Sequence, residues 1–346
     1  MRRRSSIIPD AVNKLRLLSP DEHALAAAGR ILDDCLLAVP EAPILMATED
    51  EHAELAAAIL IACDERDLEC DPVFITRESS VDDAFLGRMR VRVGRYPRSI
   101  LLCSYRIDRR LRAIFTEIGT TQRRHAHLLG INEAMLKQGL RADYREVERN
   151  GAMLLEKLGT TSVIRVQSPA GTELVARPDP RGVWHNQSGI LHSPGWTNLP
   201  AGEVVTCPLT VDGVFVPDGG LYLTDGTAID KAEAKRLKVH FEMGRVAEAE
   251  GPPDLVERLI THLDSGIDGR RVGQIGFGTN TGVLAPIGLV AQDSKLPGFH
   301  LTLSYTAAQC TGASWCGNLL VNLLQRRADV WIDSEAVLSG GRFVGF

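Results

Sequence analysis

The sequence predicts two domains: an α/β domain with a parallel, flavodoxin-like sheet over residues 1–160, and an α+β domain over residues 161–346. Three observations support this organisation. The chain has 346 residues, about twice the size of a typical domain. Short apolar runs alternate with helical patterns in the first half, which is typical of a parallel sheet covered on both faces. After Gly159, alternating strand patterns and dense glycines and prolines replace the helices.

The first half is read from its apolar periodicity, with period 2 for strands and 3.6 for helices. No glycine-rich phosphate loop follows any strand, so the sequence does not predict dinucleotide binding. The acidic stretch from Glu49 to Glu51 is interpreted as a solvated face. Strands are predicted at 43–46, 72–75, 99–103 and 127–129, and helices at 20–36, 48–62, 108–118, 132–138 and 142–157.

The second half is predicted to be α+β or mainly β. Two alternating runs flank Met243 and Gly244, which is typical of a hairpin, and a terminal hairpin is predicted to turn near Gly340 and Gly341. One amphipathic helix is predicted, at 253–265. The other strands are predicted at 162–167, 172–176, 272–276 and 299–305.

Composition excludes several classes of protein. The net charge of −5 gives no basic face for nucleic acid. No apolar run is long enough to cross a bilayer, so no membrane partner is expected. The seven cysteines are odd in number and scattered, which favours a reducing compartment over a disulfide framework. We therefore expect a cytoplasmic protein.

Three motifs in the second half occur in a distinctive order. They are Pro-x-Gly-Thr-acid-Leu at 169–174, Asn-Leu-Pro-Ala-Gly-Glu-Val at 198–204, and Gly-x-Gly-x-Asn at 276–280, followed by a strand that begins at His300. In order and spacing this half resembles the aminopeptidase T family of metallopeptidases and its relatives, the 2,5-dihydroxypyridine dioxygenases. The resemblance implies the same fold for residues 161–346. It also implies a homodimer that encloses the site.

The resemblance implies a metal site built from carboxylates and histidines. Two divalent ions would activate water in the peptidases, and one iron would serve in the dioxygenases. Residue by residue, the family's ligand positions fall on Glu203, on Gln274 in place of Glu or His, on His300, and on Cys316-Gly317-Asn318 in place of His-x-Asp. Tyr305 lies close to the family tyrosine but out of register.

The departures at these positions change the implied chemistry. Gln274 and Asn318 keep the shape of a carboxylate side chain but remove the charge that holds a dication. We therefore predict an atypical member that acts on or binds a peptide or amino-acid-like small molecule without the usual two-metal centre. No cofactor is favoured.

Three alternatives remain at this stage. Glu203 and His300 could hold a single zinc or iron ion, with Cys310 or Cys316 as a further ligand, in a hydrolase or ring-cleaving dioxygenase. Cys316 could instead be a nucleophile for acyl transfer, with His300 as its base and Asn318 or Gln274 as oxyanion donors. The chain could also be a non-catalytic peptide-binding protein.

Aromatic and histidine side chains on the loops near Glu203 are candidates for contacting a substrate. Together with Tyr305, the predicted substrate-binding residues are Trp184, His185, His192 and Trp196.

Overall fold

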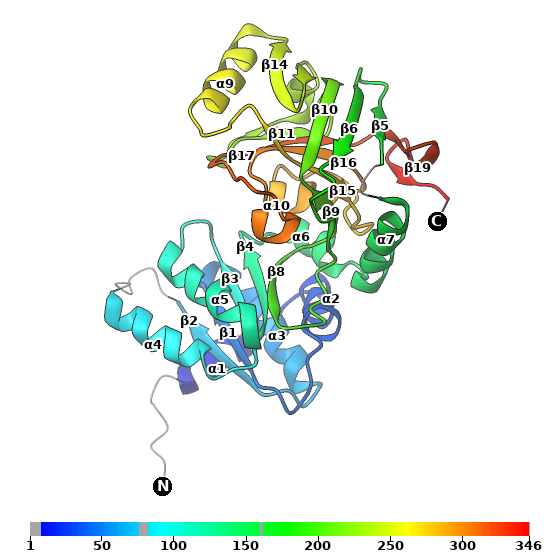
Figure 1. Cartoon of the computed structure of the whole chain (residues 1–346). Coiled ribbons are helices and arrows are strands. Elements are labelled where there is room, and N and C mark those ends of the chain that lie inside the picture. Colours follow the sequence, from blue (N-terminus) through cyan, green and yellow to red (C-terminus); the bar gives the residue numbers. More distant parts are fainter. Residues whose placement is uncertain (1–7, 76–81, 160–161, 346) are drawn as a thin grey trace. The chain divides into compact units, whose positions relative to one another are not determined.

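The computed structural model describes residues 8–75, 82–159 and 162–345 of the chain (Figure 1). The chain forms two compact units. The first consists of Met1–Arg145 and Gly189–Ala201, and the second of Glu146–Ser188 and Gly202–Phe346. Within the described residues, no helix has the length and apolar character needed to cross a membrane.

The first unit contains a five-stranded parallel sheet in the order β2-β1-β3-β4-β8. This is the flavodoxin-like order, with the first strand inside the sheet. The four strands expected from the sequence are confirmed. Their bounds are β1 (Ile44–Thr48), β2 (Cys70–Phe74), β3 (Arg98–Cys103) and β4 (Arg124–Leu129).

The fifth strand, β8 (Gly195–Leu199), was not expected. It pairs in parallel with β4, from Gly195 beside Arg124 to Leu199 beside Leu128. The first unit therefore includes a segment that begins at Gly189, about sixty residues after the end of β4, and the second begins at Glu146 rather than near residue 161. Segment β8 joins the sheet because it supplies hydrogen-bond partners for the backbone groups of β4, which would otherwise be an unpaired edge.

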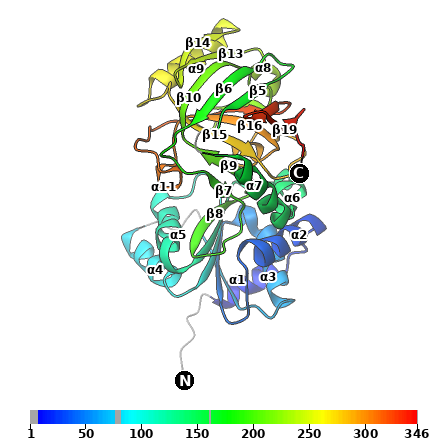
Figure 2. The same cartoon turned by 45° about the vertical axis from the view of Figure 1, so that its right-hand side comes forward.

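Helices cover both faces of this sheet (Figure 2). Alternate residues of β1 and β3, such as Leu45 and Leu101, pack against α4 (Asp83–Val93) and α5 (Arg109–Gln122). The helices α1 (Ile8–Arg16), α2 (Glu22–Arg30) and α3 (Ala53–Asp64) form a second group on the opposite face. The short helices of the unit are η1 (Ile31–Cys35), η2 (Asp50–His52), α6 (Glu133–Lys137) and η3 (Gly139–Arg141).

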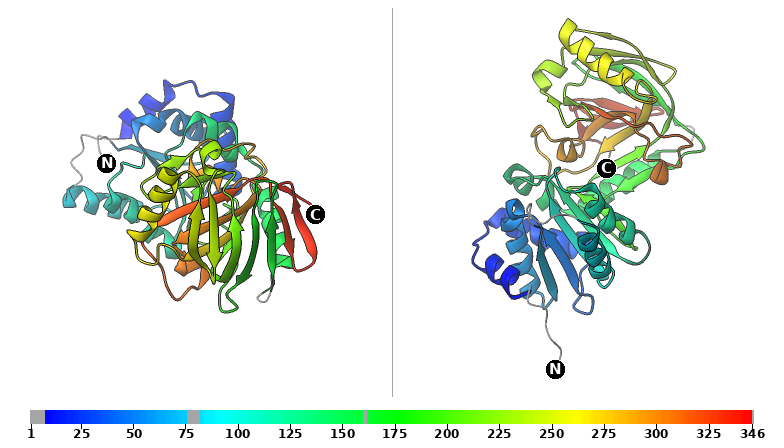
Figure 3. Two further views of the ribbon diagram at one scale, coloured as in Figure 1. Left: turned by 90° about the horizontal axis from the view of Figure 1, so that it is seen from above. Right: turned by 90° about the vertical axis from the view of Figure 1, so that its left-hand side faces the viewer.

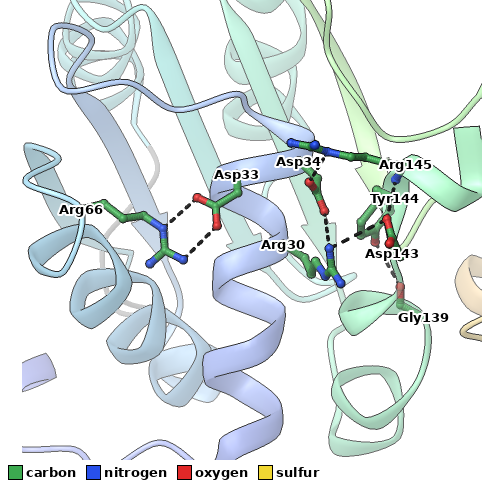
Figure 4. A network of polar contacts seen from close by, with 8 residues as sticks. All are labelled: Arg30, Asp33, Asp34, Arg66, Gly139, Asp143, Tyr144 and Arg145. Atoms are coloured by element: carbon green, nitrogen blue, oxygen red, sulfur yellow. Dashed lines mark hydrogen bonds and ion pairs between the residues drawn. The ribbon is translucent and has the colours of Figure 1, made fainter.

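A network of ion pairs lines an open groove of about 580 Å³ in the first unit (Figure 4). Arg66 forms two hydrogen bonds with Asp33, of 2.8 and 2.9 Å. Buried Asp34 pairs with Arg30 at 2.9 Å and with Arg145 at 3.2 Å. Because these arginines and aspartates neutralise one another, we interpret the network as a support that connects η1 to α3 and to the end of the unit.

The second unit is a sandwich of two antiparallel sheets (Figure 3). Their inner faces share one apolar core, with Phe215 from one sheet and Phe277 and Phe299 from the other. The eight-stranded sheet has the order β14 (Arg245–Glu250), β13 (Lys238–Glu242), β10 (Pro208–Phe215), β6 (Glu173–Pro178), β5 (Ile164–Gln167), β18 (Asp329–Ile332), β19 (Glu335–Ser339), β20 (Arg342–Phe343). The seven-stranded sheet has the order β12 (Ala228–Ile229), β11 (Gly220–Tyr222), β17 (Leu320–Gln325), β16 (Gly298–Ser304), β15 (Val272–Gly278), β9 (Glu203–Thr206), β7 (His185–Gln187).

Several expectations for this half are confirmed. The hairpin around Met243 and Gly244 is β13 and β14, and the helix at 253–265 is α9 (Pro253–Asp264), which buries Leu255, Leu259 and Leu263. The terminal hairpin is instead a three-stranded meander, β18 to β20, because the chain also turns at Asp333. The remaining helices are α7 (Tyr144–Lys157), α8 (Lys231–Ala234), α10 (Val290–Asp293) and α11 (Ala308–Thr311).

Candidate functional site

One face of the seven-stranded sheet is polar, while the other lines the sandwich core. Side chains alternate between the faces of a strand, and the register places His300 beside Gly276 and Gln274 beside Thr302. Thr302 in turn pairs with Asn322, and their side chains form a 2.8 Å hydrogen bond. Phe277, Phe299 and Leu301 point into the core. The polar face therefore collects side chains from β9, β15, β16 and β17.

Three buried, ionisable side chains meet on this face. The Nζ atom of Lys295 lies 2.5 Å from Oε1 of Glu203, and Nε2 of His300 lies 3.6 Å from Oε2 of the same carboxylate. The side chains of Glu203, Lys295 and His300 are 13%, 11% and 4% exposed. A carboxylate placed between an ammonium group and an imidazole is the principal electrostatic feature of the site.

The Gly-x-Gly-x-Asn run positions two of these residues. A β-carbon on Gly276 would collide with the imidazole of His300 and with Val205, and one on Gly278 would collide with the carbonyl of Leu296. The backbone N–H of Asn280 donates to the carbonyl of Lys295 at 2.9 Å. The glycines therefore let His300 and the chain around Lys295 lie directly against β15.

Glu203 is positioned by the glycine that precedes it. Gly202 has a φ of +122°, a conformation that side chains with a β-carbon rarely adopt. A β-carbon there would also collide with Asn280 and Val147. Gly202, in the Asn-Leu-Pro-Ala-Gly-Glu-Val motif, therefore allows β9 to lie close to β15.

Burial and charge together determine the protonation of the site. Burial opposes ionisation of Glu203, but the charge of Lys295 leads the interactions that outweigh it, so the pKa of Glu203 is lowered. Burial lowers the pKa of His300 to about 4, although Glu203 acts in the opposite direction. At neutral pH the site therefore holds a carboxylate paired with a cation and a neutral imidazole, which can donate or accept a proton.

These contacts do not fit the two-metal centre that the sequence resemblance implies. The Lys295 ammonium already neutralises the Glu203 carboxylate at hydrogen-bond distance. The Oδ1 atom of Asn318 accepts a hydrogen bond of 2.7 Å from the backbone N–H of Ile267. The ammonium of Lys295 would repel a dication beside it, and a two-metal centre would have too few anionic ligands.

The structure does not bring Cys316 and Asn318 to His300. Gly317, between them, donates its N–H to the carbonyl of Ser304. Ser304 and His300 are four residues apart on β16, a separation of about 13 Å. Tyr305 follows β16 at the same end as Gly317, whereas Glu203 pairs with Gly278 at the other end of the sheet.

Cys310 and Trp184 also lie away from the triad of Glu203, Lys295 and His300. Cys310 is in α11, where Thr311 accepts a backbone hydrogen bond from Val183. Trp184 packs against the sandwich core, with its ring centroid 6.3 Å from that of Phe277.

Of the predicted substrate-binding residues, His185 shares the sheet with Glu203. It lies on β7 and pairs with Val205. Burial lowers the pKa of His185, and the charge of Glu203 partly offsets this effect. His192 and Trp196 belong to the first unit, where the carbonyl of His192 binds Arg124 and Trp196 contacts His127.

Lys295 was not identified from the sequence. It follows the short helix α10, which Asp293 anchors by accepting hydrogen bonds from Tyr222 (2.6 Å) and the backbone of Gly288 (2.8 Å). A lysine in a polar stretch normally indicates a solvated surface. The burial of Lys295 and its contact with Glu203 arise from tertiary packing rather than from the local sequence.

We expect Gly276→Ala to lower the free energy of unfolding by about 1–3 kcal/mol, the usual cost of overpacking. The new methyl group must displace His300 or Val205. Chemical denaturation measures the change. Gly87→Ala is the control, because Gly87 lies in helix α4 with open space around it; there alanine should stabilise the protein by about 0.5–1 kcal/mol. Equal effects of the two substitutions would contradict this account.

Comparisons with known proteins agree with the geometry at the level of the fold. No protein-family model and no curated protein sequence matches the chain. Among solved structures, 2,5-dihydroxypyridine dioxygenase from Pseudomonas putida KT2440 matches with a TM-score of 0.64 and 16% identity, over 94% of this chain and 99% of that one. Wild-type AmpT, an aminopeptidase T from Thermus thermophilus, matches with a TM-score of 0.64 and 14% identity, over 93% and 99%. The chain therefore shares the fold of these two enzymes.

Proposed function

We propose that the chain binds an amino-acid-like or short-peptide small molecule at the site of Glu203, Lys295 and His300, without a two-metal centre. The observation that carries this proposal is the 2.5 Å contact between Lys295 and Glu203. Lysine supplies at this position the positive charge that a metal ion would otherwise supply. The fold shared with an aminopeptidase supports a ligand of the amino-acid class.

The charges of the site match the two ends of an amino acid. The ammonium of Lys295 can donate to a ligand carboxylate, and the carboxylate of Glu203 can accept from a ligand ammonium, because each group has further hydrogen-bonding capacity beyond their mutual contact. Neutral His300 can accept a proton from the ligand or donate one to it. The proposal therefore favours zwitterionic ligands over neutral or singly charged ones.

Isothermal titration of the full chain with amino acids and di- and tripeptides, in excess EDTA, tests the proposal. We expect at least one zwitterionic ligand to bind equally well with and without the chelator. Lys295→Met should weaken binding roughly 10–100-fold, since a hydrogen bond to a charged group contributes about 1.5–3 kcal/mol.

Lys238→Met is the matched control, because Lys238 is an exposed lysine of the same unit. Circular dichroism establishes that each variant is folded, and Glu203→Gln provides a second, isosteric test. Loss of binding on chelation, or unchanged binding in both site variants, would refute the proposal.

A further inference from the structure

Three potential metal ligands meet just after strand β1 in the first unit. Each of Glu49, Glu51 and His52 offers one ligand atom, and these atoms all lie within 4.8 Å of one another. Across the described part of the chain, this is the one group of three or more His, Cys, Asp or Glu side chains with such spacing. The group includes neither Glu203 nor His300.

Glu49 does not lie on the solvated face that the sequence pattern of this acidic stretch predicted. The residue is only 7% exposed. Its Oε2 atom accepts a hydrogen bond of 2.5 Å from the backbone N–H of Ser104, which immediately follows β3. This bond fixes the carboxylate, while the lone pairs of its other oxygen remain as acceptors. A buried carboxylate is costly unless a cation or several donors compensate its charge.

His52 provides the second and independent observation. The residue is 6% exposed, and its Nε2 atom is buried without any hydrogen-bond partner. The ring donates a hydrogen bond to the backbone carbonyl of Cys103. Since Nε2 has no partner, the donor is Nδ1–H, and the lone pair is on Nε2. Metal-bound histidines have this arrangement, with one ring nitrogen held by a carbonyl and the other left for the metal.

The lone pair of His52 faces negative charge. Its Nε2 atom lies 3.6 Å from Oε1 of Glu51, beyond hydrogen-bond distance. Two acceptors that face each other repel, and the unpaired acceptor of His52, which is buried, costs free energy as well. A cation bound between them removes both penalties.

The place in the fold is also one where ligands bind. Glu49 follows β1 and Ser104 follows β3, so both lie at the carboxyl ends of neighbouring parallel strands. The chain runs from β1 to β2 on one side and returns to β3 on the other, so the strand order reverses between β1 and β3. In open α/β sheets, ligands bind in the crevice at this point.

We propose that Glu49, Glu51 and His52 form a binding site for a divalent transition-metal ion, with zinc as its representative. One imidazole and two carboxylates suit zinc and its neighbours, whereas calcium and magnesium prefer oxygen ligands alone. Ligand atoms around a tetrahedral zinc ion lie roughly 3.4 Å apart, so the half-exposed Glu51 side chain must rotate slightly. Three protein ligands leave a coordination position open to water or a substrate.

Isothermal titration of the full chain with zinc chloride, together with metal analysis after dialysis, tests this site. We expect one equivalent of zinc to bind. His52→Ala should weaken binding by at least about 100-fold, the upper end of the effect of losing a partner in the outer shell of a metal site. Glu51→Gln changes a partly exposed side chain and should weaken zinc binding without affecting the fold. His23→Ala, a histidine of the same unit that contacts Arg141, should leave binding unchanged.

Glu203→Gln distinguishes this site from the one on the sheet of the second unit. Zinc binding that survives Glu203→Gln and is lost in Glu51→Gln and His52→Ala supports the proposal. Binding lost in Glu203→Gln but kept in His52→Ala would overturn it, and so would the absence of zinc binding by the wild-type chain. The proposed amino-acid site is tested in EDTA, so failure of either proposal leaves the other intact.

Discussion

Lys295→Met is expected to lower the free energy of unfolding by about 3–5 kcal/mol, the cost of leaving a buried charge without its partner. Glu203 would remain buried beside neutral His300 with no cation at 2.5 Å. Denaturation in urea at pH 7 measures the loss. A change below about 1 kcal/mol would show that the pair contributes little.

The pH dependence identifies the cause of this loss. In the wild type, the pKa of Glu203 is lowered, so its ion pair contributes stability above the ordinary pKa of a glutamate and loses it as the pH falls. In Lys295→Met, burial raises the pKa of Glu203 instead. The sign then reverses: the variant should become more stable relative to the wild type as the pH falls from 7 towards 4.

Two further variants control this experiment. Lys295→Met combined with Glu203→Gln removes the charge with its partner and should recover much of the lost stability. Lys238→Met removes an exposed lysine whose nearest carboxylate, Glu250, lies 3.9 Å away. Its effect should stay within about 0.5 kcal/mol. If the double variant is no more stable than Lys295→Met, loss of packing rather than charge explains the effect.

The second large effect is expected in acid and arises from two histidines on β4. His125 and His127 are 0% and 2% exposed, and Nε2 of His125 lies 3.3 Å from Nδ1 of His127. Burial lowers the pKa of both, and burial together with the charge of Arg112 lowers that of His127 to about 4. Both imidazoles are therefore neutral in the folded protein at pH 7.

Because the unfolded chain takes up these protons near pH 6.5, the folded state loses stability as the pH falls from about 6.5 to 4. For His127 alone, a pKa lowered from 6.5 to about 4 corresponds to about 3 kcal/mol over this interval. Above pH 6.5 neither state binds these protons, and stability should not depend on them. Urea denaturation at pH 7, 6 and 5 measures the slope.

His127→Phe isolates this contribution from that of the carboxylates. The variant keeps an aromatic ring beside Trp196, whose centroid lies 6.3 Å from that of His127. Its stability should fall less steeply than that of the wild type between pH 6.5 and 5. Parallel slopes would show that other groups dominate acid unfolding. His192→Phe, which changes an exposed histidine in the same unit, should keep the wild-type slope.

The local sequence pattern was sufficient to predict much of the fold. Strands β1 to β4 are short apolar runs between helices, and each alternation is visible within about ten residues. The strand β8 was not predicted because Gly195–Leu199 has no apolar alternation and joins the sheet only through its pairing with β4. Tertiary context of this kind is absent from any local window of the sequence.

The same limit applies to the candidate site. The family resemblance identified Glu203, in the Asn-Leu-Pro-Ala-Gly-Glu-Val motif, and His300, at the start of a predicted strand. Lys295 was missed because its burial and its contact with Glu203, more than ninety residues earlier in the chain, arise only from tertiary packing. Cys316 and Asn318 were grouped with His300 from the family's motif order, but the spacing along β16 separates them, and their roles stay predictions.

The late arrival of β8 has a consequence for synthesis of the protein. The first 145 residues contain four of the five strands of their sheet, yet Gly195–Leu199 emerges from the ribosome only after part of the second unit. Until then the outer edge of β4 has unpaired backbone groups, a surface on which other chains can pair. At about 5–20 residues per second this interval lasts several seconds. During that time the nascent chain stays unaggregated only if aggregation is slower than synthesis or if a chaperone protects the edge.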